Sequence, residues 1–191
     1  MLSECVVRTG LDETVEHIAG FYDSGNWNEV KLSAALFDFV SKKIDRDSYD
    51  SHVSDGYVDV KDFDQLIEQG GNCLDKSVFL ASLLEHVQKV EVILICIDGD
   101  PGHVLLEVGF QDYSRGEIVE QITEFCIMNK CESILGFSDP LTRSSENLSW
   151  FIIDPSADTI LSGKDHLVEN GYMIDTKKGY QWDRNVSKEI V

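Results

Sequence analysis

The segment from Cys73 to about Gln88 constrains the fold most, because its helical pattern is apolar on nearly every side. Its apolar residues are Val78, Phe79, Leu80, Ala81, Leu83, Leu84 and Val87. A helix that is apolar all round is buried, so we expect this one at the centre of the fold. Asn72 is a preferred N-cap, and Asp75 stands where a capping-box partner belongs. The sequence therefore predicts that Cys73 lies in the first turn of a central helix.

Three further helices are expected before this one. Apolar residues recur at helical spacing over residues 15–22 and 30–44, and a shorter helix is predicted at 61–69. Gly70 and Gly71 end that third helix. The polar stretch between the second and third helices, residues 45–59, is expected to form a loop.

Strands are expected after the central helix. Residues 91–97 and 103–110 are β-branched or alternate in polarity across a turn, which predicts a β-hairpin. A short buried strand is predicted at 150–153. The C-terminal region is expected to add three further elements, namely a strand near Thr159, a short helix near His166 and a terminal strand near Tyr180.

The chain length suits a single domain over residues 1–191. Of its 191 residues, 42% are hydrophobic, which is enough to build a core. We expect an insertion at about 111–149, containing an amphipathic helix and a polar loop. The longest apolar run, 90–97, is too short to cross a bilayer, and the N-terminus lacks the features of a signal peptide. The cytoplasm is the expected location.

The formal charge of −19 disfavours nucleic acid and anionic membranes as partners. Binding to phosphates requires a basic stripe, and no cluster of Lys and Arg here exceeds a pair. The acidic residues are spread along the whole chain, which suits a salt-adapted surface, attraction to basic partners or solubility alone.

Five cysteines have scattered spacings and form no Cys-x-x-Cys pair. We expect them to be free thiols, with no disulfide framework, structural metal or cofactor. Cys126 and Cys131 are five residues apart and could be two metal ligands, but no matching pair of Cys or His residues lies elsewhere at ligand spacing.

Cys73 has the position of a nucleophile. The free N–H groups and the dipole of a helix N-terminus favour the thiolate over the thiol, and the Cys73 N–H could stabilise an oxyanion. Gly70, Gly71 and Asn72 precede it, and the two glycines allow a substrate backbone to approach. A cysteine on a buried helix is more often simple filler, so Cys73 alone would not identify a site.

Two later residues supply the partners that a nucleophilic thiol needs. His103 opens the second strand of the hairpin, where an imidazole could reach the thiol as a general base. Asp154 ends the strand at 150–153, where a carboxylate could orient that imidazole. Taken separately, His103 could be a turn residue and Asp154 a strand terminator.

Together, the three segments resemble the transglutaminase-like superfamily. The matching sequences are GGNCLDKSVFLASLL at 70–84, GHVLLEV at 102–108 and WFIIDP at 150–155, in the order that the family shows. The resemblance covers about residues 66–155. It implies an α+β, papain-like core in which the central helix carrying Cys73 packs on an antiparallel sheet.

The resemblance also implies a cysteine protease, amidase or acyltransferase acting on amide bonds of proteins or peptides. Cys73, His103 and Asp154 would be its triad, and Gly71, Asn72, Tyr49 and Tyr57 would lie near the substrate or the oxyanion. Trp27 is a further candidate for the aromatic donor that the family places upstream, and none of these aromatic residues has a convincing spacing. The alternative is a catalytically silent binding or structural module, such as part of a virion, with residues 111–149 as a partner-docking surface.

Overall fold

The computed structural model describes residues 11–45, 53–54, 57–58, 60–97, 103–131, 147–156 and 171–175. Its helices are α1 (Asp12–Ala19), α2 (Glu29–Lys43), α3 (Phe63–Gln69), α4 (Cys73–Leu84) and α5 (Arg115–Asn129). Its strands are β1 (Val53–Ser54), β2 (Tyr57–Val58), β3 (Val90–Ile97), β4 (His103–Gln111), β5 (Leu148–Ile153) and β6 (Gly171–Asp175). The predicted α+β class is confirmed.

The main sheet has the strand order β5-β4-β3-β6, and each neighbouring pair is antiparallel. The β3–β4 hairpin is paired along its whole length, from Val90 opposite Phe110 to Ile97 opposite His103. In contrast, β5 pairs with β4 only from Leu106 to Gln111. Residues 103–105 at the start of β4 therefore run past the end of β5, and this is where the candidate site forms.

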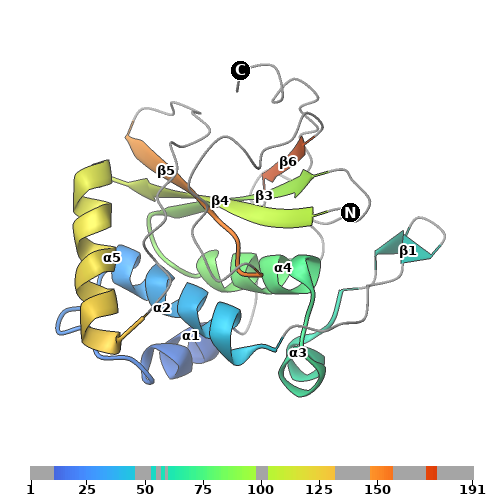
Figure 1. Cartoon of the computed structure of the whole chain (residues 1–191). Coiled ribbons are helices and arrows are strands. Elements are labelled where there is room, and N and C mark those ends of the chain that lie inside the picture. Colours follow the sequence, from blue (N-terminus) through green and yellow to red (C-terminus); the bar gives the residue numbers. More distant parts are fainter. Residues whose placement is uncertain are drawn as a thin grey trace.

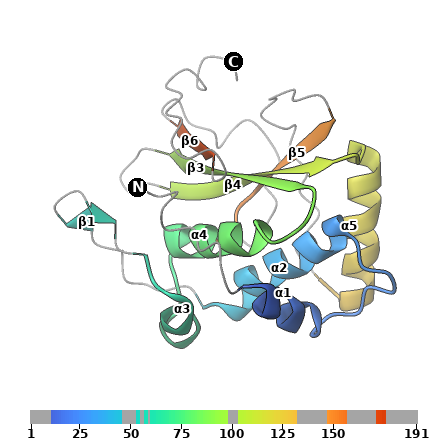
Figure 2. The same cartoon turned by 180° about the vertical axis from the view of Figure 1, so that it is seen from behind.

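The helix α4 lies directly against the sheet, and α2 and α1 lie beyond it on the same side (Figures 1 and 2). Every residue of α4 after Cys73 is buried, as the sequence predicted. The helix ends at Leu84, one turn earlier than expected. Both faces of the sheet are buried as well: one face packs on the helices, and Ile95, Leu105 and Trp150 on the other are at most 5% exposed. Burial on both faces explains why β3 is almost continuously apolar.

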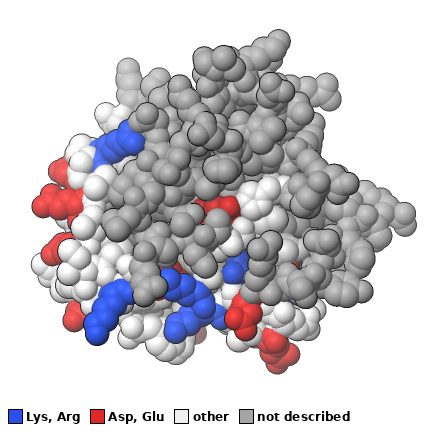
Figure 3. Space-filling view, viewed as in Figure 1, with Lys and Arg blue, Asp and Glu red and all other residues white. Residues whose placement is uncertain are grey.

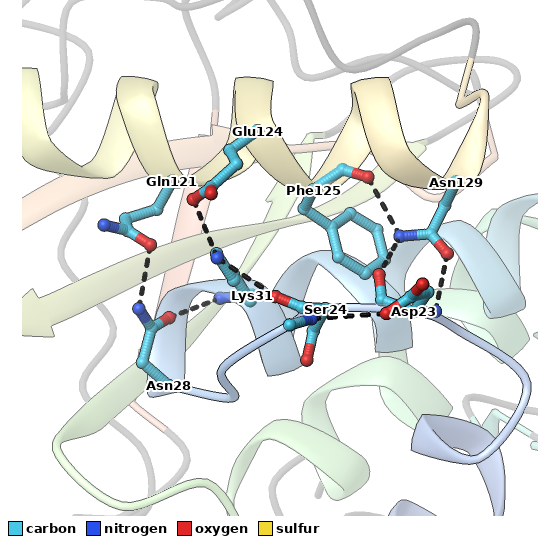
Figure 4. Close-up of polar contacts among 9 residues, drawn as sticks. Asp23, Ser24, Asn28, Lys31, Gln121, Glu124, Phe125 and Asn129 are labelled. Atoms are coloured by element: carbon cyan, nitrogen blue, oxygen red, sulfur yellow. Dashed lines mark hydrogen bonds and ion pairs between the residues drawn. The ribbon is translucent and has the colours of Figure 1, made fainter.

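The helix α5 lies along one side of the sheet and the other helices (Figure 1) and falls within the predicted insertion. Its buried residues, Ile118, Ile122, Phe125 and Cys126, form the apolar side that the sequence indicated. A row of polar contacts joins it to the start of α2 and the preceding loop (Figure 4). These contacts are Asn28 Nδ2 to Gln121 Oε1 at 2.9 Å, Lys31 Nζ to Glu124 Oε2 at 2.7 Å, and Asn129 Nδ2 to Asp23 O at 2.6 Å. The insertion thus contributes a helix that is part of the core.

The described surface carries both signs of charge. Figure 3 shows acidic and basic side chains on the same face of the molecule, and α5 itself exposes Glu117, Glu120 and Glu124. Within the described ranges, no helix combines the length and the apolar character that crossing a bilayer would require.

One prediction about the remaining elements needs correction, and three others are not tested. The expected loop at 45–59 contains a small antiparallel hairpin of β1 and β2. The C-terminal strand of the described chain is β6, at Gly171–Asp175, where it pairs with β3. The strand, helix and terminal strand predicted near Thr159, His166 and Tyr180 lie outside the described residues.

Gly109 provides a test of the packing between β4 and β5. It lies opposite Trp150, and a Cβ at Gly109 would come within 2.8 Å of the indole ring. We expect Gly109→Ala to lower the free energy of unfolding by about 1–3 kcal/mol, as overpacking of a core usually does. Urea denaturation followed by circular dichroism measures this change.

The matched control is Gly116→Ala in α5, where an added Cβ would meet nothing within 4 Å. Alanine is the better helix former, so this change should raise stability by up to about 1 kcal/mol. Equal effects of the two substitutions would contradict the close packing of Trp150 on Gly109.

Candidate active site

The N-terminus of α4 is held by a reciprocal capping box. Asn72 Oδ1 accepts hydrogen bonds from the N–H groups of Leu74 and Asp75, and Asp75 Oδ2 accepts from the Asn72 N–H. Asp75 is 1% exposed, and its other oxygen accepts from the Lys61 N–H at 3.1 Å. Within the described part of the chain, the Cys73 N–H has no such partner. The cap therefore satisfies the neighbouring donors and leaves this one for a ligand.

Gly70 and Gly71 are needed for reasons other than access to a substrate. Gly70 has a φ of 75°, which favours glycine. Gly71 is buried, and a Cβ there would lie 2.5 Å from Leu66 Cδ2 and 3.0 Å from Asp75 Cβ. Its N–H donates to Asp45 O at 2.9 Å. Both glycines thus allow α3 to pack closely against the cap of α4.

His103 and Asp154 form a short hydrogen bond, 2.6 Å from Nε2 to Oδ2. The Asp154 side chain is only 4% exposed, whereas that of His103 is 35% exposed. The other carboxylate oxygen, Oδ1, accepts from the Ser156 N–H at 2.9 Å and from its hydroxyl at 2.6 Å. Asp154 is therefore fixed from both sides and fixes the orientation of the imidazole.

Cys73 is the third member of this group. Hydrogen bonding between its thiol and the His103 side chain lowers the pKa of Cys73 and raises that of His103, and hydrogen bonding to the Val104 backbone lowers the pKa of Cys73 further. Because Asp154 occupies Nε2, Nδ1 is the ring nitrogen left for the thiol. Cys73 is half-buried, so its sulfur lies at the surface end of an otherwise buried helix.

The electrostatics favour a thiolate beside an imidazolium. Burial by itself would raise the pKa of Cys73, but the hydrogen bonds from His103 and the Val104 N–H outweigh it, and the pKa lies below its ordinary value. The hydrogen bonds to Asp154 and then to Cys73 raise the pKa of His103 to about 10. Burial opposes ionisation of Asp154 too, but the hydrogen bonds from His103 and Ser156 lower its pKa overall. The positive charge of the His103 imidazolium thus stabilises the negative charges of the Cys73 thiolate and the Asp154 carboxylate on either side of it.

Ser77 joins α4 to the start of β4. It lies one turn after Cys73, is fully buried, and donates to Val104 O at 2.9 Å. The same residue, Val104, presents its N–H to the Cys73 sulfur. The serine therefore fixes the strand segment that carries both His103 and this donor. Sequence reasoning did not identify Ser77, although a small hydroxyl four residues after the nucleophile is the available signal.

Of the remaining predicted residues, those that the structure describes do not join this group of contacts. Asn72 serves as the helix cap, while Trp27 packs beside Phe125 of α5 with ring centroids 6.4 Å apart. Tyr49 and the side chain of Tyr57 lie outside the described residues. No three or more His, Cys, Asp or Glu side chains in the described ranges are grouped to hold a metal ion.

Comparisons with protein-family models, with curated proteins and with solved structures found no match. The likeness to the transglutaminase-like superfamily thus rests on the three sequence motifs, and the chemistry of the site on its own geometry.

Alkylation of Cys73 tests the ion pair. The thiolate should persist down to the lowered pKa of Cys73 and the imidazolium up to about pH 10, so the alkylation rate should be nearly constant between these limits. At pH 6, iodoacetamide should modify Cys73 at least about tenfold faster than an ordinary exposed thiol. His103→Ala should abolish this advantage, because burial would then raise the thiol pKa without the imidazole to oppose it. Mass spectrometry of tryptic peptides measures the rate.

His17→Ala is the control, since His17 is exposed on α1. It should leave the profile unchanged. A Cys73 rate that follows a pKa of about 8.5 or higher in both proteins would show that no ion pair forms.

Ser77→Ala tests the contact between helix and strand. The change leaves the partly buried Val104 carbonyl without this hydrogen bond, which costs about 0.5–1.5 kcal/mol of stability. It should also shift the pH profile of Cys73 alkylation to higher pH, because Val104 is no longer held against the thiol.

The control is Ser82→Ala. The Ser82 hydroxyl donates to Val78 O further along α4. That change should reduce stability and leave the profile in place; an equal shift in both variants would mean that Ser77 has no local role.

Proposed function

We propose that the protein catalyses acyl transfer or hydrolysis at amide bonds of protein or peptide substrates. Cys73 is the nucleophile, His103 the acid and base, and Asp154 the orienting carboxylate. The observation that carries the proposal is the 2.6 Å hydrogen bond between His103 and the buried carboxylate of Asp154, beside a thiol at the end of α4 whose pKa His103 lowers. A papain-like core, as in the transglutaminase-like superfamily, is part of the same proposal.

The reaction begins with attack of the Cys73 thiolate on the amide carbonyl carbon. The developing oxyanion accepts a hydrogen bond from the Cys73 N–H, which the helix cap leaves free among the described residues. The His103 imidazolium then gives its proton to the leaving amine, and the C–N bond breaks to form a thioester on Cys73. Asp154 keeps the imidazole oriented throughout and stabilises its charged form.

The second half of the reaction releases the acyl group. His103, now neutral, takes a proton from an incoming water or amine, and that nucleophile attacks the thioester carbonyl. Water yields a carboxylic acid, and a primary amine yields a new amide. Both outcomes use the same three side chains, so the choice between them depends on whether water or an amine is positioned at the thioester.

Acylation by p-nitrophenyl acetate tests the proposed chemistry without knowledge of the natural substrate. We expect a burst of p-nitrophenol equal to the protein concentration, followed by slower turnover as acetyl-Cys73 is hydrolysed. Cys73→Ala should abolish the burst. His103→Ala should slow deacylation by at least about a hundredfold, because general-base catalysis typically contributes that much or more. Mass spectrometry locates the acetyl group.

A non-catalytic module would give a different result. Its Cys73 would acylate at the rate of an ordinary thiol, and the acetyl group would persist equally in the wild type and in His103→Ala. If turnover is found, casein incubated with and without a dansylated primary amine distinguishes hydrolysis, seen as cleavage or deamidation, from amine transfer, seen as fluorescent casein.

A further inference from the structure

A second thiol site lies at the C-terminal end of α5. Cys126 is in the last turn of the helix, and Cys131 follows its end. Both are free thiols. Neither takes part in the proposed active site, whose cysteine is in α4.

The backbone brings these two side chains together. Lys130 adopts the left-handed conformation, with a φ of 55°, and the chain turns back on the helix. The N–H of Cys131 then donates to Cys126 O at 3.0 Å. This is the Schellman arrangement, in which the side chains of the two residues joined by the outer hydrogen bond meet. Here both residues are cysteines, so the turn brings their side chains together against the core.

The two sulfurs differ in access. Cys126 is 7% exposed and belongs to the core, whereas Cys131 is half-buried and packs against it. Hydrogen bonding between the two thiols lowers the pKa of Cys126 and raises that of Cys131, so Cys126 is the first of the two to lose its proton. Asp38 and Lys42 of α2 are the charged groups that act on the pair, with opposite effects. An accessible thiol beside a buried one is the arrangement of an attacking and a resolving cysteine.

We propose that Cys126 and Cys131 form a redox-active dithiol that is oxidised to an intramolecular disulfide by small disulfides. Cys126 first loses its proton to water. The sulfur of Cys131 then attacks one sulfur of the oxidant R–S–S–R, passes its own proton to the Cys126 thiolate, forms the bond Cys131–S–S–R and expels one thiolate, R–S⁻. Cys126 then gives its proton to that thiolate, attacks the Cys131 sulfur and expels the second R–S⁻, which takes a proton from water or starts the next exchange. Two protein thiols are oxidised, and one R–S–S–R is reduced to two thiols. From the sequence, Cys126 and Cys131 were considered only as possible metal ligands, because they lack Cys-x-x-Cys spacing and the left-handed turn at Lys130 is what brings them together.

The test uses the full chain in buffers of reduced and oxidised glutathione. After acid quenching and capping of free thiols with N-ethylmaleimide, trypsin cuts after Arg115, Lys130 and Arg143, so the disulfide appears as peptides 116–130 and 131–143 joined together. The measured quantity is the ratio of the oxidised glutathione concentration to the square of the reduced glutathione concentration at which the joined peptides reach half their maximum. We expect this ratio to be at least about tenfold lower for the native protein than for the protein in urea. The reason is that the fold raises the effective concentration of one thiol at the other.

Two variants complete the experiment. Cys131→Ser should eliminate the joined peptides, and Cys73→Ser should leave their half-maximum unchanged, which separates this site from the proposed active site. The proposal is overturned if the native and urea-treated proteins oxidise equally, if glutathione stays attached to Cys131 without loss of the second thiol, or if Cys73→Ser prevents the disulfide.

Discussion

The burial of α4 on all sides is the constraint on which the rest of the structure depends. A helix that is surrounded by the sheet, α2 and α3 needs partners for the N–H groups of the buried residues in its first turn, Leu74 and Asp75, so this turn is closed by a cap. Asn72 and Asp75 provide this cap from the chain itself, and Lys61 and Asp45 attach the neighbouring segments to it. The only residue of the helix that is not buried is Cys73. The fold thus places a thiol where the helix meets the surface.

The site balances desolvation against charge pairing. Burial works against ionisation of both Cys73 and Asp154, and each overcomes it through the imidazole between them. The half-exposed His103 can exchange protons with a substrate, while the nearly buried Asp154 keeps its orientation through Ser156. This difference in exposure between His103 and Asp154 suits acid and base catalysis, because the group that transfers protons must be accessible and the group that orients it must be rigid.

The two thiol sites use different partners for the same purpose. At Cys73, an imidazole and a backbone N–H stabilise the negative charge, and the reaction would occur on a carbonyl carbon. At the end of α5, the partner of Cys126 is another thiol, and the reaction would occur on sulfur. Polar contacts to the start of α2 hold α5 in place. The site at Cys126 and Cys131 is therefore supported by the same core as the site at Cys73.

The local structure was largely determined by the sequence. Apolar periodicity identified the helices and the hairpin, and Asn72 with Asp75 marked the start of α4, because capping and burial patterns depend on residues close together in the chain. The motifs also named His103 and Asp154, whose side chains the structure joins by a hydrogen bond, and Cys73, whose pKa both of them affect. Only the tertiary structure decided how they meet. Two features depend on how separate elements pack: the register in which β4 runs past the end of β5, and the hydrogen bond from Ser77 to Val104 O. The turn that joins Cys131 to Cys126 depends on a left-handed residue, Lys130, that no spacing rule marks. Such contacts are set by the three-dimensional arrangement of groups, and a one-dimensional pattern does not contain their distances.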